Sequence, residues 1–331
     1  MNSLLLAFLM VGIVLAVATV GRPLIRAATP MLMRFPRVAV VSLSGGLLLW
    51  MASLVAAGLF LAWSITGPSP LPSPIADVCQ RCLEASNPFS SGLAVETTVP
   101  SVVFLLAPVL AVLVVAAMGL RSVRTRHARL RETCQSLLPV GRTESVAGYQ
   151  VTVVADPQPA AFALGRGRCG IIVSTGLLEK LSAYELRAVL EHEAAHLRER
   201  HHLILDFIGS ITGPLRWVPF AAAIADSIPH YLEISADNAA QRRVGTRPLA
   251  SALLIMGQAS NEQRIAAQRG GPRRILLAAG PERVRQLVSP LDPRQGALGA
   301  AAIVALMAVL VVTSITAHGA ALAAVLSGCV I

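Results

Sequence analysis

The stretch that decides the fold runs from residue 182 to residue 202 and reads SAYELRAVLEHEAAHLRERHH. Ser182 is followed three residues later by Glu185, which is the pattern of a capping box, in which each side chain satisfies a free backbone donor at the start of a helix. Apolar residues then recur at helical spacing, at Leu186, Val189, Leu190, Ala194 and Leu197. We therefore predict a helix that begins at Ser182 and ends at about His201 or His202.

Within this helix, His192 and His196 are four residues apart, and Glu193 directly follows the first histidine. Residues i and i+4 share a helix face, so both imidazoles can bind one metal ion while Glu193 reaches a water on that ion. The pattern predicts a zinc (Zn2+) site with Glu193 as the catalytic base. The alternative is that both histidines only pack in a core. Ala194 and Ala195 favour the metal site because small side chains leave room for an ion and a substrate.

The third metal ligand is expected on a second helix, predicted from about residue 228 to residue 243 and ended by Gly245. Glu233 and Asp237 lie one turn apart on this helix. We predict that Glu233 is the third ligand, and that Asp237 accepts the remaining N–H of a ligand histidine and so fixes its tautomer. The alternative for this pair is an exposed acidic helix face.

The composition indicates a membrane protein. Of 331 residues, 54% are hydrophobic and only 14% are charged, which is far more apolar than an ordinary soluble domain. A helix needs about 20 apolar residues to cross the hydrocarbon core of a bilayer. Four runs are predicted to do so, at residues 4–20, 38–65, 102–120 and 298–317.

Arginine clusters set the predicted orientation, because basic residues keep a loop in the cytoplasm. One cluster follows the first run, from Arg22 to Arg37, and another follows the third, from Arg121 to Arg131. We expect a multi-pass protein of the plasma membrane. Residues 1–120 are expected to form a membrane region with three spans and an external loop at 66–98. Residues 121–297 are expected to form a cytoplasmic domain, and residues 298–331 a fourth span with a short external C-terminus. The net charge of +10 comes from arginines beside apolar runs, so no direct nucleic-acid binding is expected.

The polar domain is predicted to begin with short strands at residues 151–155, 161–164 and 171–174, the last two joined by a turn. Residues 203–225 are apolar but are interrupted by glycines and prolines. We interpret that segment as a bent connection, membrane-facing or buried, and not as a fifth span. In the external loop, Cys79 and Cys82 form the only close cysteine pair, for which a local disulfide is preferred over free thiols.

These motifs resemble the gluzincin metallopeptidases, and more narrowly the membrane-bound BlaR1/MecR1-like family (family M56), with the HtpX-like peptidases (family M48) as close relatives. The resemblance rests on His192-Glu193-x-x-His196, on Glu233-x-x-Ala236-Asp237, and on the stretches 161–163 and 171–178. It covers residues 151–243 at the level of motifs. It implies a multi-span α-helical membrane protein with a cytoplasmic α+β zincin-like metallopeptidase domain.

The resemblance also implies a substrate class: a protein or peptide, with a cytoplasmic transcriptional repressor as one candidate. The strand at 161–164 or at 171–174 is then expected to pair with an extended substrate, the alternative being an ordinary buried hairpin. The chain ends soon after its fourth span, without the penicillin-binding domain for which the BlaR1-like sensors are known. We therefore do not expect it to sense a β-lactam in that way.

Two other functions remain open from the sequence. One is an HtpX-like protease for quality control of membrane proteins, which would have broad substrate specificity. The other is a non-enzymatic membrane scaffold with a structural metal, against which Glu193 argues. A closed structural site would need a fourth protein ligand, and His201 and His202 are predicted to point away from the face of His196 on a continuous helix.

His230 and Tyr231 are candidates for stabilising an oxyanion, because they lie on the helix of the third ligand.

Overall fold

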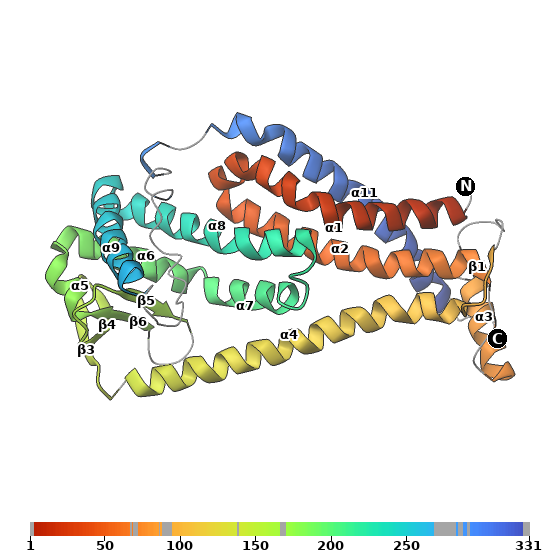
Figure 1. The fold of residues 1–331 in the computed structure, drawn as a ribbon, viewed down its shortest axis with the longest axis horizontal. Coiled ribbons are helices and arrows are strands. Elements are labelled where there is room, and N and C mark those ends of the chain that lie inside the picture. The colour runs from red at the N-terminus through yellow and green to blue at the C-terminus, as the bar shows by residue number, and fades with distance from the viewer. Residues whose placement is uncertain are drawn as a thin grey trace.

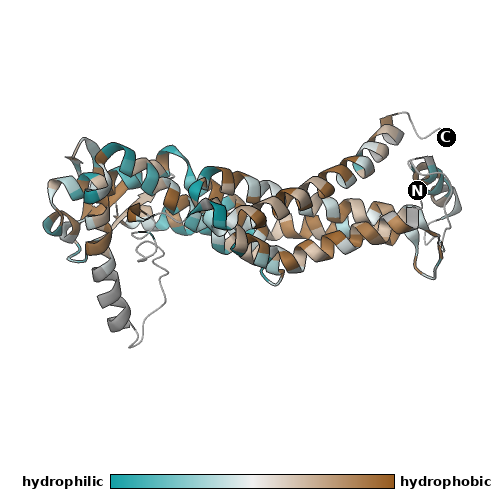
Figure 2. Ribbon diagram, turned by 90° about the horizontal axis from the view of Figure 1, so that it is seen from above, coloured by the Kyte–Doolittle hydropathy of each residue, from teal (hydrophilic) through white to brown (hydrophobic). Residues whose placement is uncertain are grey.

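The computed structural model shows an elongated molecule with an apolar helical bundle and a polar end that contains a small sheet (Figure 1). Figure 2 shows mostly hydrophobic residues along the bundle, and hydrophilic ones at the sheet end and on the short helix at the opposite end. The structure describes residues 3–66, 68, 72–85, 87, 95–137, 139–165, 170–267, 283, 287–289 and 292–326.

Four helices are long and apolar enough to cross a membrane, and they cover the four predicted runs to within a residue. They are α1 (Ser3–Arg34), α2 (Pro36–Ser64), α4 (Ser101–Leu137) and α11 (Ala297–Leu326). A short 3-10 helix, η1 (Pro293–Gly296), leads into α11.

Two of these helices extend well beyond the apolar runs, which corrects the predicted boundaries. Arg22, Arg26 and Arg34 were expected in a loop after residue 20, but they lie on α1 itself, which continues through Pro23 and Pro30. Packing of α1 against α2, α8 (Pro219–Val244) and α11 outweighs the helix-breaking tendency of the two prolines. Helix α4 likewise continues 17 residues past the predicted end at Leu120, to Leu137.

The segment predicted as the external loop contains regular structure. Helix α3 (Ser73–Ala85) lies within it. Strands β1 (Ile65–Thr66) and β2 (Val95–Glu96) pair in parallel and bring its two ends together. Cys82, on α3, is disulfide-bonded. The side chain of its predicted partner, Cys79, lies outside the described residues.

Cys134, near the end of α4, is also disulfide-bonded, which the spacing of the five cysteines did not predict. Its side chain is buried against Ile172 of the sheet.

The polar end is built on a four-stranded sheet. The strands are β3 (Arg142–Val146), β4 (Tyr149–Val154), β5 (Ala161–Leu164) and β6 (Gly170–Ser174). The strand order is β3-β4-β6-β5, so β5 lies at one edge. Strand β6 runs parallel to β4 and antiparallel to β5. Strand β3 was not predicted, because four of its five residues are exposed and it has no apolar face.

Ser174 ends the sheet and caps the short helix α5 (Thr175–Lys180). The capping box predicted from Ser182 and Glu185 is present and starts helix α6 (Ala183–Arg198). One face of α6 packs on the sheet through Val189 and Leu190. Helix α9 (Thr246–Ala267) packs against the same helix.

The prediction that α6 continues to His201 or His202 is wrong. The helix ends at Arg198, and Arg200 adopts the left-handed conformation with φ 54°. The chain then starts a new helix, α7 (His201–Thr212), in a different direction. The sequence signal for the turn is weak, because arginine rarely takes a positive φ.

The segment 203–225 forms most of a helical hairpin, as Figure 1 shows. After α7, a turn over residues 213–217 leads into α8. Helix α8 begins at Pro219, about ten residues before the predicted start, and has Pro229 in its interior. Gly245, with φ 86°, ends it as predicted.

The α7–α8 hairpin packs into the bundle. Phe220 of α8 lies in the bundle core, 6.2 Å from the ring of Trp50. A Cβ added at Gly119 of α4 would come 2.3 Å from the carbonyl oxygen of Ser210 on α7. Gly119 is thus the residue type that lets these two helices approach closely.

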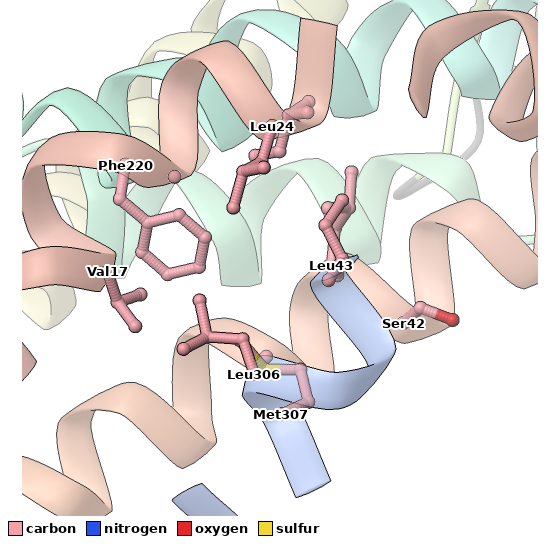
Figure 3. A pocket seen from close by; sticks show the side chains of 11 residues that line it. Val17, Leu24, Ser42, Leu43, Phe220, Leu306 and Met307 are labelled. Atoms are coloured by element: carbon pink, nitrogen blue, oxygen red, sulfur yellow. The ribbon is translucent and has the colours of Figure 1, made fainter. Parts of the chain in front are cut away.

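Where α1, α2, α8 and α11 meet, a small apolar cavity remains (Figure 3). Phe220, Leu43 and Leu306 point into it. It contains no titratable side chain, so the chemistry of the protein must be sought elsewhere.

Candidate active site

Helices α6 and α8 bring together the three residues predicted to hold a metal. The Nε2 atoms of His192 and His196 lie 3.1 Å apart. The carboxylate of Glu233 lies 3.5 Å from each of them, through Oε2 and Oε1 respectively. Among the described residues, this is the one group of three or more His, Cys, Asp or Glu side chains found close enough to share an ion.

These separations fit a zinc ion. A tetrahedral zinc with bonds of about 2.0–2.1 Å places its ligand atoms roughly 3.3 Å apart. The observed values of 3.1, 3.5 and 3.5 Å are close to that spacing, with Oε2 of Glu233 facing His192 and Oε1 facing His196. His192 and Glu233 are mostly buried, so the donors are held by surrounding structure.

Asp237 lies behind His192, as predicted. Its Oδ1 atom is 3.0 Å from Nδ1 of His192, at ion-pair distance but without the alignment of a full hydrogen bond. Burial lowers the pKa of His192, but Asp237 and Glu233 outweigh it and raise that pKa to about 10. The surroundings therefore favour a positive charge at this position, whether a proton or a metal ion supplies it.

Arg283 is the residue of the site that the sequence did not reveal. Its guanidinium is 3% exposed and lies between the two carboxylates of α8. Nη1 is 3.0 Å from Glu233 Oε2, while Nη2 and Nε donate to Asp237 over 2.6 and 2.8 Å. Burial raises the pKa values of Glu233 and Asp237, yet His192 and Arg283 more than compensate and hold both at about 2. Both carboxylates are therefore ionised at neutral pH.

Glu193 faces the end of strand β5. The backbone N–H of Ala163 donates to its carboxylate. Burial raises the pKa of Glu193, and the charge of Glu233 adds to that rise, while His192 and Arg283 oppose it. A carboxylate with a raised pKa is a stronger base than an exposed one, as general-base catalysis requires.

The sequence prediction about His201 is wrong. Because the chain turns at Arg200, His201 returns to the site: its Nδ1 lies 2.9 Å from Nδ1 of His196. Its Nε2 lies 3.2 Å from Glu199 Oε2, and the side chain is 2% exposed. Since Nδ1 of His201 faces His196 and not the ligand set, His201 lies outside the candidate metal site and does not close it.

Tyr231 is not an oxyanion donor in this structure. It is buried in the bundle core and its hydroxyl bonds to Thr29 of α1, so it faces the membrane helices. His230 is half-buried beside it, with ring centroids 6.1 Å apart.

Comparison with known proteins points to a peptidase. Residues 124–264 match the model of peptidase family M48. A "Protease HtpX homolog" of Caldanaerobacter subterraneus subsp. tengcongensis is 38% identical over 66 residues, which cover 19% of this chain. The match spans 22% of the length of that relative. No solved structure matches the chain significantly.

The matches are with the M48 peptidases, and nothing among them distinguishes the BlaR1/MecR1-like family. The matched segment contains His192, Glu193, His196 and Glu233. Together with the four apolar helices, the comparisons support a membrane-bound metallopeptidase.

Proposed function

We propose that this protein is a membrane-bound, zinc-dependent endopeptidase. The observation that carries the proposal is the convergence of His192 Nε2, His196 Nε2 and the Glu233 carboxylate, close enough to share one ion. Three protein ligands leave a fourth position for water or substrate, as catalytic zinc sites do.

His192, His196 and Glu233 would hold a zinc ion, which would supply Lewis acidity for polarising the scissile carbonyl and acidifying a water. Glu193 then has the role of base. Its buried carboxylate accepts a proton from the attacking water and passes it to the leaving amine. The N–H of Ala163 that donates to Glu193 holds the carboxylate in place.

Strand β5 is the proposed substrate-binding strand. Of the two predicted candidates, β5 lies at the sheet edge, whereas β6 is paired on both sides. An edge strand can add an extended peptide through backbone hydrogen bonds, which places few demands on its side chains. Ala163 contacts Glu193, so a peptide paired with β5 would run beside the base.

Two substrate classes follow from the proposal. A transcriptional repressor would suit a regulatory peptidase of the BlaR1/MecR1-like kind. Membrane proteins in need of degradation would suit an HtpX-like protease, and the similarity to an HtpX homologue is equally consistent with this second class.

The test compares wild type with Glu193→Gln. The amide keeps the shape of the side chain but cannot accept a proton, and loss of a general base typically costs about 10² to 10⁴ in rate. We expect purified wild-type protein to contain about one zinc per chain and to cleave unfolded protein, and the variant to keep the zinc and lose the cleavage. Proteomic comparison of cells carrying the two forms would then identify substrates. Cleavage by Glu193→Gln at the native rate would refute the assignment of the base.

We propose from the arginine clusters that the peptidase domain faces the cytoplasm. The disulfide at Cys134 runs against this orientation, because disulfides are rare in that compartment. Alkylation of intact cells and of lysates would separate the two cases. A reduced Cys134 that reacts only after lysis would support a domain that faces the cytoplasm. An oxidised Cys134, together with external labelling of a cysteine placed near Glu179, would refute this orientation.

A further inference from the structure

The two candidate ligand histidines are supported differently. A histidine that binds metal through Nε2 normally donates its Nδ1–H to an acceptor, which fixes its tautomer and ring orientation. Beside His192 the carboxylate of Asp237, on α8, faces Nδ1 at 3.0 Å. Within the described part of the chain, the atom found facing Nδ1 of His196 is Nδ1 of His201, at 2.9 Å.

The proton positions around His201 follow from its other contact. Nε2 of His201 faces Glu199 Oε2 at 3.2 Å, and a carboxylate can only accept, so this nitrogen carries the proton. A His196 that binds metal through Nε2 carries its own proton on Nδ1, the atom that faces Nδ1 of His201 at 2.9 Å. Nδ1 of His201 is therefore an acceptor.

His196 must then donate to His201 through its own Nδ1–H. With the proton on Nδ1, the lone pair of Nε2 points toward His192 and Glu233. A metal ion is the partner that this arrangement prepares for.

Glu199 is itself held from two sides. It is the residue after the end of α6, and its carboxylate accepts hydrogen bonds from Ser235 of α8, at 3.0 Å, and from Arg37 in the first turn of α2. Arg37 uses both Nη2, at 2.5 Å, and Nε, at 3.3 Å. The pair is bidentate, which fixes the orientation of the carboxylate as well as its charge.

We propose that His201 is a positioning residue for the metal: it accepts Nδ1–H of His196 and keeps Nε2 of His196 directed at the ion, and Glu199, held by Arg37 and Ser235, orients His201. This inference rests on the proposed zinc site. It adds a line of contacts from a membrane helix, α2, to a metal ligand on α6. A movement of α2 that withdraws Arg37 would loosen the His201 ring and, through it, His196.

The test measures zinc affinity of the full-length protein by competition with a chelating dye. His201→Leu removes the acceptor, and we expect affinity to fall by about 10- to 100-fold, as for other outer contacts of metal ligands. His201→Asn places an amide oxygen near the position of Nδ1, so it should restore much of that loss. Arg37→Gln should give a smaller loss in the same direction.

His202→Leu is the matched control, since His202 is the next residue and lies against Gly165, directly after strand β5. It should leave zinc affinity unchanged. Cobalt(II) substitution adds a readout that general destabilisation would not move. The visible absorption band should shift in His201→Leu, because the His196 ring turns, and should return toward wild type in His201→Asn.

The outcomes are distinct. If wild type binds zinc and His201→Leu binds it equally well with an unchanged cobalt spectrum, the positioning role is refuted while the zinc site stands. If wild type binds no zinc, or if a His192→Ala/His196→Ala double variant binds as much zinc as wild type, the proposed function fails. This inference then fails with it.

Discussion

Replacing Arg283 by leucine should lower the free energy of local unfolding around the candidate site, and the effect should depend on pH in a defined way. The guanidinium contacts two ionised carboxylates, Glu233 and Asp237, over 2.6 to 3.0 Å while almost fully buried. Removing one partner of a buried ion pair costs about 3–5 kcal/mol, because the remaining charge is left without compensation.

His192 moderates this cost. It stays beside both carboxylates and, with its pKa raised to about 10, carries a positive charge in the zinc-free protein. We therefore expect the lower end of the range, about 3 kcal/mol, or roughly a 150-fold increase in the population of locally open states. Zinc should reduce the difference, since the ion would neutralise Glu233.

The sign of the pH dependence follows from the two acids. Their pKa values are depressed to about 2 in the folded protein, so they contribute stability above their ordinary pKa values and lose it as the pH falls through the folded values. Without Arg283 the depression is smaller, so less of that stability is present at neutral pH. The deficit of the variant should be largest at pH 7 and should shrink as the pH falls from about 5 toward 3.

Hydrogen exchange of the amides of α6 and of the second half of α8 is the measurement, made on zinc-free protein across this pH range. Arg283→Lys should give intermediate protection from exchange, because lysine keeps the positive charge but lacks the planar guanidinium that contacts both carboxylates. Arg294→Leu, the same change at an exposed arginine of η1, is the control. Unchanged protection in Arg283→Leu at pH 7, or a deficit that is constant with pH, would refute the role assigned to Arg283.

Other changes test the remaining contacts. His196→Ala removes a ligand and should abolish both zinc binding and cleavage, as elemental analysis and a protease assay would show; full zinc occupancy would remove His196 from the site. Asp237→Asn should weaken zinc affinity or activity by about 10- to 100-fold, measured by chelator competition, and an unaltered affinity and rate would mean that His192 is held by other means. Ser182→Ala removes the hydroxyl that accepts from the N–H of Glu185 and should destabilise the first turn of α6 by about 1 kcal/mol, seen as faster amide exchange there; equal exchange would show that the bond from Ser251 to Glu185, at 2.5 Å, is sufficient.

The sequence predicted those parts of the site that depend on local spacing. His192, Glu193 and His196 share one helix, and Glu233 and Asp237 share another, so helical periodicity alone could place each group. The capping box and Gly245 could be predicted for the same reason, since their hydrogen bonds and backbone angles are local.

What could not be predicted depends on the path of the chain between elements. A left-handed turn at Arg200 reverses the expected position of His201, and no glycine or asparagine marks it. Arg283 is 46 residues from Asp237 along the chain, and Arg37 is 162 residues from Glu199. Such pairings depend on how elements distant in the sequence pack together. The chain is rich in arginine, so many arginines could have paired with these carboxylates.

Helix α8 has a consequence for where a substrate would be cut. One continuous helix carries Phe220 in the core of the membrane bundle and Glu233 at the candidate metal site. Thirteen residues at about 1.5 Å each separate the two by roughly 20 Å along the helix axis. The helix therefore fixes the distance between the core of the apolar bundle and the candidate metal site. An extended chain covers that distance in about six residues, so a substrate anchored in the same membrane would be cleaved at a nearly constant number of residues from its own span, whatever its sequence there.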